Sequence, residues 1–444
     1  MSPAWSGSRA PGLPLTRAEF ATSMARLGPW PGSGRVAVAV SGGADSLCLA
    51  YLLAWWGRPV GLIIDHGLRP GSAAEAAVTL ERLAAFGVPA RVLSLRDLQA
   101  GPGLAERARA ARYAALSAAA REAGCVDLLL GHHRLDQAET VLMRRAAGSG
   151  RAGLASMAAI VETQDLRLVR PLLDVPPGRL RATLRQAGVA WVDDPSNRNP
   201  AALRNRLRAG FDDPDGAGET VAALSGEAAR FGACRRAEDA RAAQVLADRV
   251  AIRPEGFALL SPGPLPVPAL AALVRTIGGG VYPAGTAQLA RLAAEPRAAV
   301  LGGVRFMPAG RLGPGLLVVR EAAAMAPPVP AMDGAAWDNR FKLHAAHATH
   351  GLTVGATFGA LASDAARLRG RSKLPFAVLR TLPAVRLQGA LAAVPHIGYL
   401  EGSLCEGLVA SFCPAHPLAA APFGVAAGDA QSAASPHVEF DGAG

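Results

Sequence analysis

Lysine is nearly absent from this chain of 444 residues, because only Lys342 and Lys373 occur among 46 basic residues. Arginine therefore supplies almost all of the positive charge, and its planar guanidinium is suited to phosphate contacts. Aromatic residues make up 5% of the chain and apolar residues 50%, so we expect cores of Ala, Leu and Val. The length allows two or three domains.

No two of the cysteines form a Cys-x2-Cys pair, which excludes a locally encoded zinc ribbon or iron–sulfur motif. Their odd number favours reduced thiols in a cytoplasm. No stretch reaches 18 uninterrupted apolar residues and residues 1–34 lack the apolar run of a signal peptide, so the sequence predicts no membrane contact. The cysteines are Cys48, Cys125, Cys234, Cys405 and Cys413.

The positive charge is concentrated in the first half of the chain. Residues 1–210 hold 26 arginines against 16 acidic residues, whereas residues 211–444 are nearly balanced. A composition bias alone would spread the excess over both halves. The asymmetry therefore indicates a polyanionic partner for the first half.

The most informative stretch is Ser41-Gly42-Gly43-Ala44-Asp45-Ser46. Residues 35–40 predict a short buried strand and residues 47–56 a helix, so the stretch is a tight turn at a helix N-terminus. Such a turn can bind an anion through backbone N–H groups and the helix dipole. It lacks the terminal Lys of the Walker loop. The alternative is an ordinary turn of small residues, which would not explain a carboxylate inside an anion loop.

Strands and helices alternate after this turn. Strands are predicted at 59–64, 91–95 and 126–130, with helices at 73–86 and 104–123 and an N-terminal helix at 15–27 opened by Thr16 and Glu19. This alternation predicts an α/β fold in which a parallel sheet has helices on both faces. Ligands of such sheets bind at the carboxyl ends of the strands. There we expect three segments to meet: the Ser41–Ser46 turn, Asp65-His66-Gly67 and Gly131-His132-His133.

The string from Gly131 to Thr140 contains a second candidate site. Asp136 and Glu139 are three residues apart, so they share one face of a helix. Two carboxylates on one face suit a magnesium ion or a cationic amine, and His132 and His133 could donate to phosphate. The alternative is a polar helix start whose acidic residues favour the helix dipole.

Residues 134–208 hold 13 arginines against 7 acidic residues. They comprise an extended run at 169–173, a basic helix at 175–188, a turn at 193–197 and a basic helical segment at 203–208. An isolated cluster of this kind is usually a solvated face. Beside an anion-binding turn, contact with an RNA backbone is the better interpretation.

The second half of the chain is less informative. Residues 216–250 predict a long helix, which we place in a connector at 213–250. Helices at 269–276 and 286–292 and strands at 300–307 and 316–320 predict a smaller mixed domain over 251–423, followed by a mobile tail at 424–444. His344, His347 and His350 are spaced by three, but one helix face rarely completes a metal site, so a polar helix or loop is favoured.

The Ser41–Ser46 turn resembles the loop of the N-type ATP pyrophosphatases, which split ATP to AMP and pyrophosphate. Five strings between residues 35 and 210 resemble, in order, the tRNA(Ile)-lysidine synthetases: the turn, Asp65–Pro70, Gly131–Thr140, Asp194-Pro195-Ser196-Asn197 and Arg204-Asn205 with Arg208. Two positions depart from the family pattern. Leu135 stands where an Asp is usual, and Ala147 replaces an Arg. An apolar residue at the start of a helix over a parallel sheet is normally buried, so we expect Leu135 to pack against the sheet.

The resemblance implies an N-type ATP pyrophosphatase domain at 35–212, preceded by a tail and short helix at 1–34. It implies that ATP and Mg²⁺ are used to attach L-lysine to C2 of the wobble cytidine of a tRNA(Ile) with a CAU anticodon, through an adenylated cytidine, so that the tRNA reads AUA and is charged with isoleucine. The C-terminal domain would contact tRNA. An inactive RNA-binding relative, a 2-thiolating enzyme and a small-molecule amidating ligase are the alternatives, although the cysteine pattern disfavours the second and the basic stretch the third.

Site residues follow from the same positions. The resemblance implies ATP binding by Ser41, Gly42, Gly43, Ala44, Asp45, Ser46, Asp65 and His66, and catalytic roles for Asp45, Arg109, Arg112, His133, Asp136 and Glu139. Asp45 and Asp136 would hold the metal. The expected RNA contacts are Arg144, Arg145, Arg198, Arg204, Arg206 and Arg208.

Overall fold

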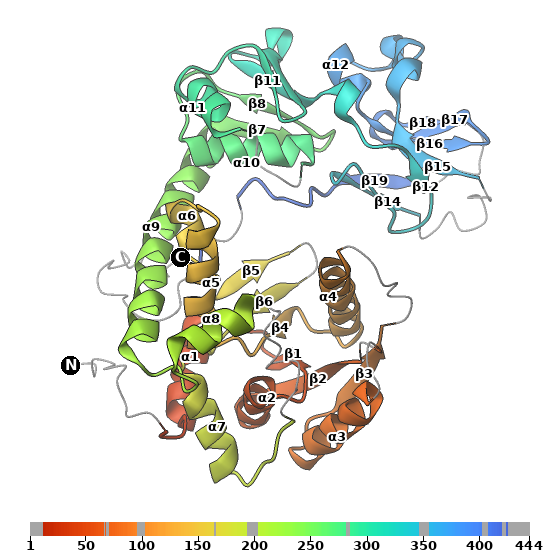
Figure 1. Ribbon diagram of the computed structural model, residues 1–444. Helices are drawn as coiled ribbons and strands as arrows, with labels where there is room; N and C mark the ends of the chain where they lie inside the picture. Colours follow the sequence, from red (N-terminus) through yellow and green to blue (C-terminus); the bar gives the residue numbers. More distant parts are fainter. Residues whose placement is uncertain are drawn as a thin grey trace, which may run out of the picture. The chain divides into compact units, whose positions relative to one another are not determined.

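The computed structural model forms two compact units, which are Met1–Arg236 with Ala421–Gly444 and Ala237–Ala420. The division falls inside one long helix, α9 (Glu219–Arg249) (Figure 1). The structure describes residues 12–65, 67, 71–95, 103–163, 166–192, 203–280, 285–345, 355–401, 407–419 and 423–424. His66, Arg198 and the turn at 193–197 lie outside these ranges, as do His347, His350 and residues 425–444.

Unit 1 is built on a six-stranded sheet in the order β3-β2-β1-β4-β6-β5. The predicted parallel sheet is confirmed, and only the edge strand β5 runs antiparallel, to β6. The strands expected at 35–40, 59–64, 91–95 and 126–130 form with ends shifted by at most one residue. The strands are β1 (Arg35–Val40), β2 (Arg58–Asp65), β3 (Ala90–Ser94), β4 (Asp127–Leu129), β5 (Ile160–Glu162) and β6 (Arg167–Val169).

Side-chain alternation in β1 decides which helices cover each face of this sheet. Val36, Val38 and Val40 point into one core, which also receives side chains of α1 (Arg17–Arg26), α2 (Ala44–Trp56), α3 (Ser72–Ala85) and α7 (Pro177–Gln186). Ala37 and Ala39 point into the other, with side chains of α4 (Leu104–Glu122). The sheet is therefore covered by helices on both faces, as the alternation predicted.

The capping box predicted for α1 is present. Thr16 Oγ1 accepts from the Glu19 N–H at 3.2 Å, and Thr16 N–H donates to Glu19 Oε2 at 2.9 Å. Arg179 of α7 donates to the same Glu19 oxygen at 2.9 Å. Burial would raise the pKa of Glu19, but these contacts outweigh it and hold the pKa at about 2. The box thus joins two helices that cover one face of the sheet.

Helix α5 (Arg134–Ala146) follows β4. It packs against the short α6 (Arg151–Leu154) and against α8 (Leu203–Phe211). We expected Leu135 to be buried against the sheet. It is 1% exposed, but it belongs to a cluster with Val221 and Leu224 of α9 and no strand residue. The burial was predicted correctly and the packing partner was not, because residues 217–228 return to cover the first turns of α5.

Unit 2 contains three antiparallel sheets, ordered β7-β8-β11-β10-β9, β12-β15-β16-β17-β18 and β13-β14-β19. Residues 300–307, predicted as one strand, form a hairpin of β9 (Ala299–Leu301) and β10 (Val304–Pro308) turned at Gly302 and Gly303. His344 ends strand β14 rather than lying on a helix. The other strands are β7 (Val250–Arg253), β8 (Phe257–Leu260), β11 (Leu316–Arg320), β12 (Val329–Pro330), β13 (Ala336–Trp337), β14 (Phe341–His344), β15 (Thr357–Ala360), β16 (Pro383–Leu387), β17 (Ala390–Val394), β18 (Tyr399–Leu400) and β19 (Val409–Phe412).

Three helices complete unit 2: α10 (Val267–Gly278), α11 (Thr286–Ala294) and α12 (Phe376–Leu379). The first two pack on the β7–β11 sheet through Leu270, Leu273 and Leu289. None of the helices in the described ranges is long and apolar enough to span a bilayer.

Candidate functional site

A cavity of about 510 Å³ lies at the carboxyl edge of the sheet in unit 1. The ends of β1 and β4 and one face of α4 form its wall, as the parallel topology requires. Most of the predicted ATP and catalytic residues therefore meet. The lining residues are Ala39, Ser41, Gly43, Asp45, Ser46, Ala108, Arg109, Arg112, Tyr113, Leu130, Gly131, His132, His133, Asp136 and Arg208.

The Ser41–Ser46 turn is closed by its own hydroxyl groups. Ser41 N–H donates to Ser46 Oγ at 3.1 Å, and Ser46 Oγ–H donates to the Gly43 carbonyl at 3.2 Å. Gly43 caps α2 without a side-chain hydrogen bond, so the first-turn N–H groups are not covered by a cap. Gly42 has a φ of 82°, and a Cβ there would approach Thr79 Oγ1 to 2.5 Å. Only glycine fits this position.

Gly131 brings the end of β4 against this turn. A Cβ at Gly131 would lie 2.9 Å from the Cα and N atoms of Ser46, so any larger residue would push the end of β4 away from the first turn of α2. Asp65, by contrast, does not line the cavity, because its Oδ1 accepts from Ser72 Oγ–H at 2.6 Å and Gly67 N–H at 3.0 Å. It therefore shapes the turn that follows β2.

His133 lies between two carboxylates. Its Nε2 is 3.4 Å from Asp45 Oδ2, and its Nδ1 is 3.6 Å from Asp136 Oδ2. Burial alone would lower the pKa of His133, but Asp136 and Asp45 outweigh it and raise the pKa above 6.5. Burial would likewise raise the pKa of Asp136, yet His133, His132 and Arg208 hold it below its ordinary value. His133 thus joins the Ser41–Ser46 turn, which we call the phosphate turn, to α5, which we call the acidic helix.

Glu139 lies at the base of the acidic group and is fully buried. Arg208 Nε donates to Glu139 Oε1 at 2.6 Å, and Arg208 Nη2 lies 3.4 Å from Asp136 Oδ1. Burial nevertheless keeps the pKa of Glu139 above its ordinary value. Arg208, which the sequence placed among the RNA contacts, therefore neutralises the acidic pair at the cavity wall.

Two carboxylate oxygens of this group are buried without a hydrogen-bond partner, Asp45 Oδ1 and Glu139 Oε2. Oxygen atoms of this kind suit a hard cation or an ammonium group. Among the residues the structure describes, no three His, Cys, Asp or Glu side chains lie in a metal-binding group. The residues therefore fit a magnesium ion that takes one or two carboxylates and completes its shell with phosphate and water.

Arg109 and Arg112 of α4 also line the cavity. Burial lowers the pKa of Arg112; the neighbouring Tyr113 opposes this shift, and the charge of Arg109 adds a smaller lowering effect. Two neighbouring guanidinium groups in a poorly solvated place favour an anionic ligand. Tyr113 was missed by the sequence analysis, although its i, i+4 spacing from Arg109 could have indicated it.

The described side chains among the expected RNA contacts have different surroundings. Arg144 donates to the Gly153 carbonyl at 2.9 Å, Arg145 pairs with Glu227, and Arg206 is exposed on α8. Helix α8 includes Arg204, but the side chain of Arg204 is not among those described. We retain Arg206 as an exposed candidate on α8.

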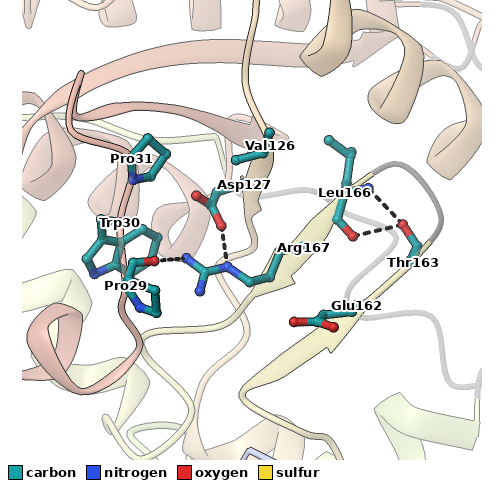
Figure 2. Close-up of a pocket in the computed structure, with 9 residues that line it drawn as sticks. All are labelled: Pro29, Trp30, Pro31, Val126, Asp127, Glu162, Thr163, Leu166 and Arg167. Carbon is teal, nitrogen blue, oxygen red and sulfur yellow. Dashed lines mark hydrogen bonds and ion pairs between the residues drawn. The ribbon is translucent and has the colours of Figure 1, made fainter. Parts of the chain in front are cut away.

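A second groove, of about 540 Å³, lies at the amino ends of β4 and β6 (Figure 2). Two of its charged residues, Asp127 and Arg167, already contact each other. Arg167 Nε donates to Asp127 Oδ1, and Arg167 Nη2 donates to the Pro29 carbonyl at 2.7 Å, with the guanidinium over the ring of Trp30. This groove lies at the edge of the sheet opposite the phosphate turn, and we do not include it in the candidate site.

Comparison with known proteins agrees with the geometry. Residues 17–211 match a family model described as a PP-loop domain. Three similar curated proteins are each called tRNA(Ile)-lysidine synthase. One from Bradyrhizobium sp. is 45% identical over 44% of this chain and 56% of its own length, one from Methylobacterium nodulans 41% over 61% and 84%, and one from Ruegeria pomeroyi 33% over 84% and 91%.

The residues matched by the family model lie in the unit that contains the cavity. The chain spans about half the length of the first three curated relatives that it matches. The relatives from Methylobacterium nodulans and Ruegeria pomeroyi are matched over most of their length, so the likeness extends beyond the PP-loop domain. By these matches, and by a cavity formed where the phosphate turn meets an acidic helix, the chain belongs to the tRNA(Ile)-lysidine synthase family.

Proposed function

We propose that this protein uses ATP to attach L-lysine to C2 of the wobble cytidine in the CAU anticodon of a tRNA(Ile). The product would read AUA instead of AUG, and the tRNA would be charged with isoleucine instead of methionine. The observation that carries the proposal is the cavity, because the uncapped Ser41–Ser46 turn and the carboxylates of Asp45 and Asp136 line one volume of about 510 Å³. A reaction between a polyanionic nucleotide and a cationic amine needs both kinds of group.

The residues divide by charge. The amides and hydroxyls of Ser41, Gly43 and Ser46 hold the phosphates, while Arg109 and Arg112 neutralise them from α4. Asp45 and Asp136 hold magnesium, which when bound neutralises phosphate oxygens. Asp136 at the cavity wall is also the candidate acceptor for the ammonium group of lysine, while the buried Glu139 behind it is paired with Arg208.

The chemistry requires no nucleophilic side chain. The C2 oxygen of cytidine attacks the α-phosphate of ATP and releases pyrophosphate, and the amine of lysine then attacks C2 and releases AMP. The protein contributes positioning and charge neutralisation, which are worth several orders of magnitude in rate. His133, whose pKa Asp136 and Asp45 raise, keeps the two halves of the site in register.

Two basic surfaces are candidates for the tRNA backbone. In unit 1 we retain Arg206 on α8, beside Arg204. In unit 2 a surface segment at 367–380 exposes five basic side chains, and two of them lie over aromatic rings: Arg369 Cζ is 5.4 Å from the centroid of Phe376 and Arg371 Cζ is 5.6 Å from that of Tyr399. Basic side chains interleaved with aromatic rings suit RNA.

A tRNA substrate and the reduced Cys48, Cys125, Cys234 and Cys413 fit a cytoplasmic enzyme.

Mass spectrometry of a CAU-anticodon isoleucine tRNA tests the proposal. After incubation with ATP and lysine, the wobble nucleoside should gain the mass of lysine less one water. The methionine tRNA with the same anticodon is the matched control. A 2-thiolating enzyme would instead give a sulfur-containing nucleoside, and an inactive relative would bind the tRNA without releasing pyrophosphate.

A further inference from the structure

The phenol ring of Tyr113 belongs to two environments. It lines the cavity, and it also packs against the core on the α4 face of the sheet, which contains Leu116, Leu128 and Leu130. A side chain anchored in a core has little freedom to move. The ring is therefore a fixed surface at the wall of the site.

Arg109 lies on that surface. Its Cζ is 5.1 Å from the centroid of the Tyr113 ring, within the range of a cation–π contact. The two residues are four apart on α4, so the helix itself brings them together. Arg112 lies on the same helix face, so the two positive charges repel each other. In the described part of the chain neither guanidinium forms an ion pair with a carboxylate that would offset this repulsion. The ring opposes this repulsion.

We propose that Tyr113 is a positioning residue that holds Arg109 in the cavity for the phosphates of ATP. The proposal rests on the proposed function in one respect, that ATP is the ligand. A long arginine side chain loses rotamer freedom when it binds, and a guanidinium that is already placed loses less. The ring face provides this placement.

Arg170 confines the other end of the ring. It follows β6, is nearly buried and donates to the Ala158 carbonyl at 2.8 Å. Burial lowers the pKa of Arg170, and the neighbouring Tyr113 hydroxyl offsets part of that effect. This contact involves the hydroxyl and not the ring face, so variants of Tyr113 can separate the two roles.

Calorimetric titration of the full chain with ATP, without tRNA, tests the proposal. We expect Tyr113→Leu to weaken ATP binding about fivefold to tenfold, as loss of a cation–π contact implies. Tyr113→Phe keeps the ring face and should bind ATP within about twofold of the wild type. Tyr51→Leu on α2 is the matched control, because that ring contacts Phe86 outside the cavity. If Tyr113→Leu does not fold, Tyr113→Met removes the ring with an adaptable side chain.

A double-mutant cycle isolates the coupling. If Tyr113 acts through Arg109, the Tyr113→Leu/Arg109→Ala variant should bind ATP no more weakly than Arg109→Ala alone. The proposal would be overturned if the losses of ATP affinity in the two single variants multiplied in the double variant, or if Tyr113→Leu bound ATP as well as the wild type. It would also be overturned if Tyr113→Phe bound ATP as weakly as Tyr113→Leu, or if the wild type did not bind ATP. Coupled ATP binding without lysidine formation would instead contradict the proposed function alone.

Discussion

Arg208 Nε donates to Glu139 Oε1 at 2.6 Å, although the two residues are 69 positions apart. The Glu139 side chain is fully buried, whereas that of Arg208 remains 37% exposed. Arg208 therefore brings a solvent-reachable charge to a carboxylate that water cannot reach, which is the arrangement that allows a buried Glu to be ionised. The pair links α8 to the acidic helix beside the phosphate turn.

Removal of Arg208 should leave Glu139 without a partner. We expect Arg208→Gln to lower stability by about 1–3 kcal/mol, at the lower end because the site is partly hydrated. Glu139→Gln in the same background should restore part of that loss, since a neutral amide is cheaper to bury than an unpaired charge. Denaturant unfolding of the single and double variants measures both effects. Equal stability of Arg208→Gln and wild type would contradict the pairing.

Asp45 should be needed for catalysis and not for folding. Its Oδ1 is buried without a hydrogen-bond partner, so Asp45→Ala removes a cation ligand and relieves an unsatisfied charge. We expect an unchanged thermal unfolding midpoint and loss of pyrophosphate release in the presence of tRNA and lysine. Glu122→Ala is the control, because that carboxylate pairs with Arg91 on the surface. Near-normal turnover of Asp45→Ala would refute the cation role.

Leu135→Asp should destabilise the protein while leaving the acidic pair in place. The side chain is 1% exposed among Val221 and Leu224, so a carboxylate there would be buried without a partner. We expect a loss of several kcal/mol in stability and little change in the lysine incorporated per folded molecule. Asp136→Ala, in contrast, should abolish incorporation. Activity raised manyfold in Leu135→Asp would mean that the missing carboxylate limits the enzyme.

Affinity for tRNA should fall steeply with salt concentration. We expect Arg206→Ala and Arg204→Ala each to reduce the slope of log affinity against log salt by about one, as loss of one phosphate contact predicts. Arg91→Ala removes the same charge from a surface ion pair and should leave the slope unchanged. Filter binding at several salt concentrations gives the slopes. An affinity that does not depend on salt would exclude backbone contacts by α8.

The stability contributed by His133 should depend on pH. Because its folded-state pKa lies above 6.5, the contribution is complete below about pH 6.5 and is lost as the pH rises through the folded-state pKa. His133→Gln should therefore destabilise the protein more at about pH 6 than at about pH 9. Denaturant midpoints across this range measure the difference.

His396 provides the opposite case. Burial lowers its pKa, so its charged form is disfavoured in the fold and its contribution grows as the pH rises. His396→Gln should therefore cost more stability at high pH than at low pH. The same trend in both variants would show that the ionisation of His133 is not what links stability to pH.

Local patterns in the sequence were sufficient for the fold of unit 1. The Val-rich strand before Ser41, the glycines of the turn, the capping box of Thr16 and Glu19 and the alternation of strands with helices all act within a few residues, so each could be identified from the sequence alone. The rule that ligands bind at the carboxyl ends of parallel strands then brought His133 and Asp136 to the turn. The cavity lining agrees with that expectation.

Contacts between distant segments were decided only by the tertiary structure. An Arg on a basic helix has the same sequence signature whether it contacts RNA or a buried Glu. Only the packing of α8 against α5 shows that Arg208 contacts Glu139. Leu135 had to be buried because it is apolar, but the return of α9 chose its partner. Sequence determined which surfaces had to be covered and where the phosphate turn lies. Which segments cover them depends on long-range packing, which no local pattern records.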